Sequence, residues 1–119
     1  MGSPKKVLVI DDHPAMGMSL KLMLSPEHEV EIAATPEAAL SLLSAARFDL
    51  VLCDVMMPGM SGVELFAKVS AQDGALAQRF VLMTGGATSA AMARAIEGSK
   101  LKVLEKPFDP ELLRGMLRD

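Results

Sequence analysis

Five short runs of β-branched and leucine residues alternate along this chain with longer segments of helical period. Such alternation is typical of a parallel sheet whose strands are joined by crossover helices. The runs span residues 7–10, 29–32, 50–53, 80–83 and 101–104. We therefore expect an α/β domain built on five parallel strands.

The charge content of these runs predicts their order in the sheet. Runs 7–10, 50–53 and 80–83 are apolar without alternation, as expected of strands covered on both faces, whereas runs 29–32 and 101–104 carry charges and are expected at the edges. With right-handed crossovers, this predicts a flavodoxin-like (βα)5 doubly wound sheet with strand order 2-1-3-4-5. Ligands of such sheets bind at the carboxyl ends of the strands, so functional residues are expected there.

Helices are expected between the runs, over 14–24, 36–46, 62–71, 89–97 and 110–118. Proline near three of the starts is typical of a first helical turn. With 119 residues, half of them apolar, the chain is expected to fold as one domain over 5–119. Residues 1–4 have no apolar stretch of the kind found in secretory signals and are interpreted as a disordered lead or a cloning remnant.

Composition limits the classes of partner. Twelve basic against fifteen acidic residues, with no Trp and no Tyr, disfavour direct nucleic-acid binding. No run is long enough to cross a bilayer, so no direct membrane contact is expected. The single cysteine, Cys53, has no internal disulfide partner, which makes a reducing, cytoplasmic compartment the default expectation.

Polar residues follow four of the five runs: Asp11 and Asp12, then Asp54, Thr84 and Lys106. Because the carboxyl ends of parallel strands lie on one side of the sheet, we expect a common pocket. Two carboxylates about 4 Å apart repel by about 4 kcal/mol at an effective dielectric of about 20, and one lysine cannot offset three acids. Mg²⁺ prefers oxygen ligands and leaves positions free for phosphate oxygens, so the predicted chemistry is magnesium-dependent phosphoryl transfer.

The pattern of these residues resembles the receiver domains of two-component response regulators and hybrid histidine kinases, the CheY-like superfamily. The resemblance covers nearly the whole chain and rests on an acidic pair, an Asp before a Met-Pro-Gly turn, a Thr and a Lys-Pro pair, here Asp11-Asp12, 54–62, Thr84 and Lys106-Pro107. It implies that Asp54 takes a phosphoryl group from the phosphohistidine of a histidine kinase or histidine phosphotransfer domain.

The resemblance also implies a role for each neighbour of Asp54. The implied metal ligands are Asp54 itself, Asp12, the backbone carbonyl of Met56 and, through a water, Asp11. The implied contacts to phosphoryl oxygens are Lys106 and Thr84. A cis peptide bond is expected before Pro107. The family further implies an output partner or a dimer at the fourth helix, fifth strand and fifth helix, although Val103 stands where many receivers carry an aromatic switch residue.

The first expected helix carries two apolar lines. The core stripe is Met16, Leu20, Met23 and Leu24, and the second line is Ala15, Met18 and Leu22. One helix cannot bury both lines against one sheet. The second line therefore predicts a docking surface for the helical bundle of the phosphodonor.

Other interpretations stay open at this point. Taken singly, Asp12 fits a helix cap before Pro14, Asp54 a turn, Thr84 a cap and Lys106 a solvated side chain. A silent interaction module of the same fold and a Mg²⁺-dependent aspartyl-phosphate hydrolase are the alternative functions. The hydrolase fits less well, because such enzymes usually carry their nucleophile after the first strand. The histidines, His13 and His28, are interpreted as bystanders.

Overall fold

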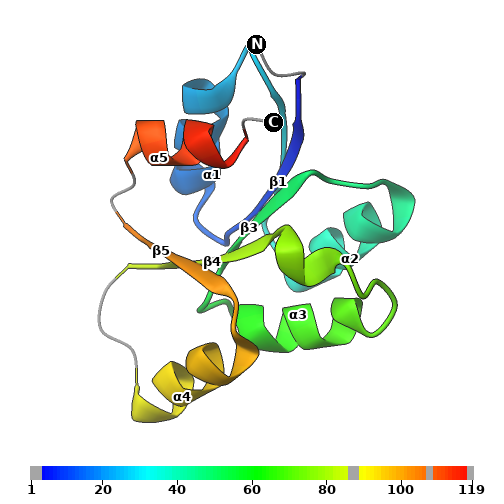
Figure 1. The fold of residues 1–119 in the computed structure, drawn as a ribbon, viewed down its shortest axis with the longest axis vertical. Coiled ribbons are helices and arrows are strands. Elements are labelled where there is room, and N and C mark those ends of the chain that lie inside the picture. Colours follow the sequence, from blue (N-terminus) through cyan, green and yellow to red (C-terminus); the bar gives the residue numbers. More distant parts are fainter. Residues whose placement is uncertain (1–3, 86–88, 107–108, 118–119) are drawn as a thin grey trace.

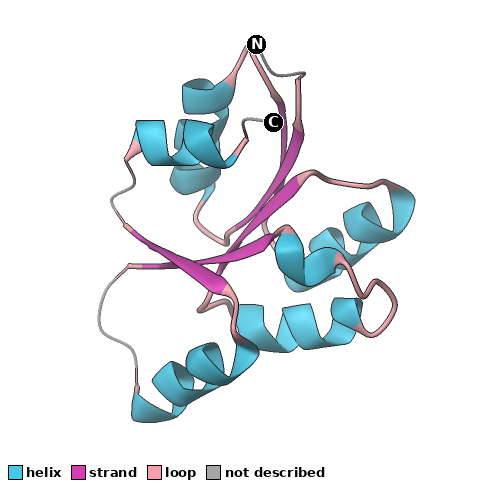
Figure 2. Cartoon of the chain, viewed as in Figure 1, coloured by secondary structure: helices cyan, strands magenta, loops and turns pink. Residues whose placement is uncertain are grey.

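The computed structural model describes residues 4–85, 89–106 and 109–117. It contains a five-stranded parallel sheet in the order β2-β1-β3-β4-β5, with helices on both faces (Figures 1 and 2). The expected fold class and strand order are both confirmed. Residues 1–3 of the expected lead 1–4 and the cis bond expected before Pro107 lie outside the described residues.

The observed elements agree with the expected ones to within two residues at each end. The strands are β1 (Lys6–Ile10), β2 (Glu29–Ala33), β3 (Leu50–Asp54), β4 (Phe80–Thr84) and β5 (Lys102–Glu105). The helices are α1 (Pro14–Leu24), α2 (Pro36–Ala45), α3 (Gly62–Ser70), the short 3-10 helix η1 (Leu76–Gln78), α4 (Ala90–Ser99) and α5 (Pro110–Met116). The 3-10 helix η1 is not among the elements expected from the sequence.

Two apolar layers hold the helices to the sheet. Val7 and Val9 of β1 face a layer with α1 and α5, whereas Leu8 and Ile10 face a layer with α2, α3 and η1. The alternation of side chains along a strand explains this division, because successive residues point to opposite faces. Figure 1 shows α1 and α5 on one side of the sheet and α2, α3 and α4 on the other. With both faces covered, the ends of the strands are where polar groups can reach solvent.

Helix α1 presents the two apolar lines that its sequence predicts. Leu20 and Leu24 are buried, with Met16 and Met23 partly buried against the same layer. On the second line Ala15 is exposed, and 52% of Met18 and 75% of Leu22 are exposed. The second line is therefore an apolar surface of the domain. No helix among the described residues has the length and apolar character needed to cross a membrane.

Close packing of α1 against β2 depends on Gly17. A methyl group added there would lie 2.8 Å from Cγ2 of Ile32. Overpacking of this kind costs about 1–3 kcal/mol, against about 0.5–1 kcal/mol that a helix interior gains from Gly→Ala. We expect Gly17→Ala to lower the free energy of unfolding by about 1 kcal/mol in urea denaturation.

The matched control is Gly98→Ala in α4, where a methyl group would meet no described atom within 4 Å outside the helix's own backbone. This variant is expected to raise the free energy of unfolding by about 0.5 kcal/mol, since it gains helix propensity without a clash. Equal stabilisation by both variants would contradict the proposed clash with Ile32.

Candidate functional site

The carboxyl ends of β1 and β3 bring two buried acids together. Asp11 follows the last residue of β1 and Asp54 is the last residue of β3, and the register pairs Ile10 with Cys53. Asp11 is 0% exposed and Asp54 is 6% exposed. Two buried carboxylates at neighbouring strand ends repel each other strongly, so a positive group must lie nearby.

Lys106 supplies positive charge from the end of β5. Its Nζ lies 3.2 Å from Oδ2 of Asp11 and 3.8 Å from Oδ2 of Asp54. The backbone N–H of Lys106 donates to the carbonyl of Thr84 at 2.8 Å, which places the lysine beside the end of β4. The fold therefore brings Lys106 into contact with Asp11, although the two residues lie 95 positions apart in the sequence. The interpretation of Lys106 as a solvated side chain is wrong.

The loop after β3 is held close to Asp54. The N–H of Met56 donates to Oδ1 of Asp54 at 3.3 Å, and the N–H of Gly62 donates to the carbonyl of Val55 at 2.9 Å. A Cβ at Gly62 would lie 2.6 Å from the carbonyl oxygen of Asp54, so only glycine permits this approach of α3 to β3. A capping box between Ser61 and Glu64 fixes the start of α3.

Four side chains at this edge could hold a metal ion. The potential ligand atoms of Asp11, Asp12, His13 and Asp54 all lie within 4.8 Å of one another. Within the described chain, Oδ1 of Asp12 is buried and accepts no hydrogen bond. A buried carboxylate oxygen without a donor is costly in a folded protein, and a cation would remove that cost. These residues therefore fit a divalent ion with oxygen ligands, such as Mg²⁺.

The structural role considered for Asp12 is wrong. The N-cap residue of α1 is His13, and no side chain caps this helix. The carboxylate of Asp12 instead lies toward the acid cluster, with Oδ1 3.3 Å from Nδ1 of His13. His13, interpreted as a bystander from sequence, therefore belongs to the cluster. The position of His13 directly after the acidic pair is the sequence feature that could have predicted its place in the cluster.

The remaining predicted residues lie at the rim. Thr84 is the partly buried last residue of β4, and its neighbour Met83 pairs with Asp54 in the sheet. Met56 is 60% exposed, and its backbone N–H contacts the carboxylate of Asp54. Cys53 is buried and its thiol pKa is raised by burial and by the charges of Asp54 and Asp11, in agreement with its interpretation as a small hydrophobe.

Burial sets the acidity of Asp54. Removal from water raises the pKa of this carboxyl above its usual value, and the charges of Asp11 and Asp12 raise it further. The charge of Lys106 and the N–H of Met56 act in the opposite direction and favour the anion. Asp54 is therefore a buried carboxyl whose ionised form depends on positive partners.

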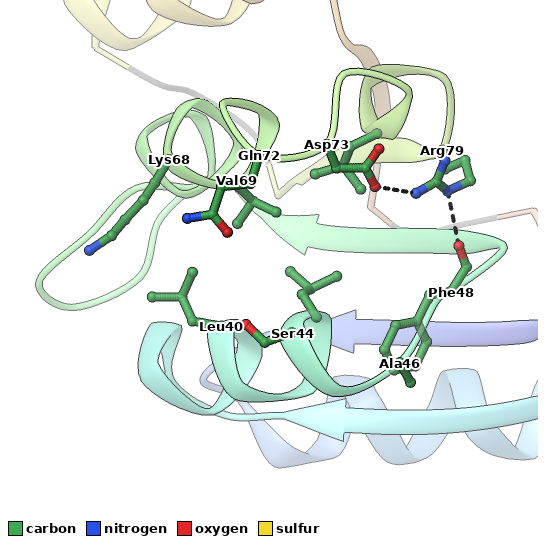
Figure 3. A pocket seen from close by; sticks show the side chains of 11 residues that line it. Leu40, Ser44, Ala46, Phe48, Lys68, Val69, Gln72, Asp73 and Arg79 are labelled. Carbon is green, nitrogen blue, oxygen red and sulfur yellow. Dashed lines mark hydrogen bonds and ion pairs between the residues drawn. The ribbon is translucent and has the colours of Figure 1, made fainter.

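A cavity of about 370 Å³ lies near the amino ends of β3 and β4, between α2, α3 and η1 (Figure 3). Arg79 borders it and donates to the carbonyls of Phe48 and Ala75 and, at 2.7 Å, to Oδ2 of Asp73. These hydrogen bonds connect the guanidinium group of Arg79 to the segments before β3, before η1 and after α3. This cavity is separate from the acid cluster.

Comparison with known proteins assigns the chain to a family. Residues 7–118 match the family described as response regulator receiver domain. The nitrate/nitrite response regulator protein NarP of Escherichia coli (strain K12) is 34% identical over 119 residues, which cover 98% of this chain and 54% of NarP. The chemotaxis protein CheY4 of Vibrio cholerae superposes with a TM-score of 0.81 at 32% identity, covering 97% of both chains.

The chain therefore belongs to the receiver domains of two-component response regulators. It spans about half the length of curated relatives such as NarP. It is also 29% identical over 110 residues to the sensor histidine kinase TmoS of Ectopseudomonas mendocina, covering 92% of this chain and 11% of that protein. The matched relatives thus include a response regulator and a sensor histidine kinase.

The raised pKa of Asp54 makes a prediction for stability. A carboxyl with a raised folded-state pKa stabilises the fold below its unfolded pKa, and this contribution is lost as pH rises through the folded value. With divalent ions removed by EDTA, Asp54→Asn is expected to have a higher urea midpoint than the native chain at pH 7, and this difference should shrink toward about pH 4.

Asp73→Asn is the control of opposite sign. Its hydrogen bond from Arg79 lowers the pKa of Asp73, so this carboxylate stabilises the fold above its unfolded pKa and loses that effect as pH falls through the folded value. Asp73→Asn should therefore have a slightly lower urea midpoint than the native chain at pH 7. A lower midpoint for Asp54→Asn as well would refute the assignment of a buried, destabilising charge to Asp54.

Proposed function

We propose that Asp54 accepts a phosphoryl group from the phosphohistidine of a histidine kinase or phosphotransfer domain, in a Mg²⁺-dependent reaction that switches protein–protein interactions. The proposal rests on the arrangement of acidic and basic side chains around Asp54 in a chain that belongs to the receiver family. Its carboxylate lies in a cluster with Asp11 and Asp12 and 3.8 Å from the Lys106 ammonium. The domain would catalyse its own phosphorylation without being a turnover enzyme.

In this reaction a carboxylate oxygen of Asp54 attacks phosphorus while the phosphorus–nitrogen bond of the phosphohistidine breaks. The bonding electron pair leaves with the imidazole, and the product is an acyl phosphate on Asp54. Lys106 and the N–H of Met56 favour the anionic nucleophile, as their effect on its pKa indicates. The same lysine, 3.8 Å from Oδ2 of Asp54, would pair with a phosphoryl oxygen as negative charge spreads over the transferred group.

The metal would be held by Asp12 and Asp54 directly, by the backbone carbonyl of Met56, and by Asp11 through a water. The buried Oδ1 of Asp12, which has no donor in the described chain, supports this assignment. When bound, Mg²⁺ supplies charge neutralisation for the acids and for the phosphoryl oxygens. Thr84, at the end of the neighbouring strand, would donate its hydroxyl to another phosphoryl oxygen.

Two surfaces would serve the partners. The second apolar line of α1 begins two residues after His13 and so lies beside the site, which suits a helical bundle that presents a phosphohistidine. The output surface would be α4, β5 and α5, where Val103 is 39% exposed and Leu112 is 52% exposed. We infer that this domain contacts proteins and neither nucleic acid nor membrane directly.

The alternative functions have less support. An aspartyl-phosphate hydrolase would carry its nucleophile after the first strand with another Asp two residues on, whereas β1 here is followed by the adjacent acids Asp11 and Asp12 and then by His13. A silent receiver would not need a carboxylate oxygen buried without a donor. That orphan oxygen favours the active receiver over the silent one.

Labelling with a small phosphodonor tests the proposed function. Incubation with Mg²⁺ and acetyl phosphate should add the mass of one phosphoryl group to the intact chain, since Asp54 is the proposed acceptor. Asp54→Asn should abolish the adduct, and EDTA should prevent it. Asp73→Asn, an acid-to-amide change beside the cavity near the amino ends of β3 and β4, should be labelled like the native chain. An adduct that persists in Asp54→Asn would contradict the assignment.

Substitution of the second apolar line tests the docking surface. The double variant Met18→Ser and Leu22→Ser should lower kcat/KM for transfer from a phosphorylated histidine partner by about tenfold, because each removes an exposed apolar contact. Labelling by acetyl phosphate should stay unchanged. Leu112→Ser, the same chemical change at an exposed leucine of α5, is the control. Unchanged transfer from the partner would discredit this surface.

A further inference from the structure

His13 lies at the mouth of the acid cluster with one ring nitrogen directed at the carboxylates. Its Nδ1 is 3.2 Å from Oδ1 of Asp11 and 3.3 Å from Oδ1 of Asp12. Two ligands bound at right angles at about 2.1 Å from a metal are about 3.0 Å apart. These nitrogen–oxygen separations are therefore close to those within one coordination shell.

The local sequence holds the ring in this place. His13 precedes Pro14, which disfavours the helical region for it, and it is extended with φ −100° and ψ 106°. Its backbone N–H donates to Oδ1 of Asp11 at 2.9 Å. The backbone of His13 is thus fixed from both sides, while 73% of its side chain is exposed and open to an incoming ion.

The buried Oδ1 of Asp12 gives a second reason to place a cation between these groups. Within the described chain this oxygen accepts no hydrogen bond, although Nδ1 of His13 lies 3.3 Å away. The ring therefore approaches the oxygen without satisfying it. An ion coordinated by both atoms would satisfy the carboxylate oxygen and use the imidazole lone pair.

We propose that His13 is a nitrogen ligand that makes this site bind first-row transition cations such as Co²⁺ and Zn²⁺ as well as Mg²⁺. Mg²⁺ prefers oxygen ligands and keeps several waters, whereas transition cations bind imidazole well. The tautomer with its proton on Nε2 presents the Nδ1 lone pair to the ion. The inference rests on the proposed function, because it uses the same acids as the magnesium site.

Calorimetric titration of the full chain at pH 8 with Co²⁺ and, separately, with Mg²⁺ tests the proposal. His13→Asn should weaken Co²⁺ binding by about tenfold or more and leave Mg²⁺ binding within about twofold. The visible spectrum of bound Co²⁺ should also change, because an oxygen ligand replaces nitrogen. His28→Asn is the matched control and should change neither affinity, since that ring accepts from the N–H of Lys5.

Equal Co²⁺ affinities in the native chain and His13→Asn would overturn the proposal, as would no Co²⁺ binding or an equal loss for both metals. Should His13→Asn unfold, His13→Gln gives the same comparison. Acetyl phosphate labelling of the same preparations separates the two proposals. His13-dependent Co²⁺ binding without labelling would refute only the proposed function. Labelling with His13-independent Co²⁺ binding would refute only this inference.

Discussion

Repulsion among carboxylates at the carboxyl edge of the sheet is the constraint on which the site depends. Asp11 and Asp54 are buried at neighbouring strand ends, and Asp12 adds a third charge. One ammonium, from Lys106, opposes them at 3.2 Å and 3.8 Å. A cluster of this composition keeps net negative charge, so it attracts cations and repels a phosphoryl donor unless a cation is present. The same feature therefore explains why metal and phosphoryl chemistry would be linked.

The fold makes this arrangement possible because its layers leave the strand ends as the place for charge. β1, β3 and β4 are covered on both faces, and their buried residues divide between two apolar layers. The close approach of α3 at Gly62 leaves no room for a side chain against the backbone carbonyl of Asp54. Burial raises the pKa of Asp54, and positive partners restore its anionic form. The acidity of Asp54 is thus set by packing as much as by its charged neighbours.

The strand order and most of the site could be predicted from sequence because each depends on a pattern along one strand. Glu29 and Glu31 mark an edge strand, and the structure pairs both with Lys6. The acids and Lys106 follow strands whose ends must meet. The orientation of a side chain is harder to predict. The sequence around His13 does not reveal whether its ring faces solvent or the acids, because this depends on the torsion angles of His13 in the folded chain. The 3-10 helix η1 lies between Asp73 and Arg79, whose side chains are hydrogen-bonded to each other. No periodic pattern in the sequence predicts such a contact.

Binding of a metal ion at the acid cluster would be coupled to folding of this domain. An ion that binds the folded acids and not the unfolded chain stabilises the fold by RT ln(1 + [L]/Kd), about 2.7 kcal/mol at a hundredfold excess over Kd. Without the ion, the raised pKa of Asp54 means that its ionised form destabilises the fold at neutral pH. Phosphorylation would place still more negative charge in the same cluster. The ion would therefore offset the repulsion among the acids before the proposed reaction and the charge of the phosphoryl group after it. The charge balance of this edge, more than the shape of the fold, is the quantity that the phosphorylated state would change.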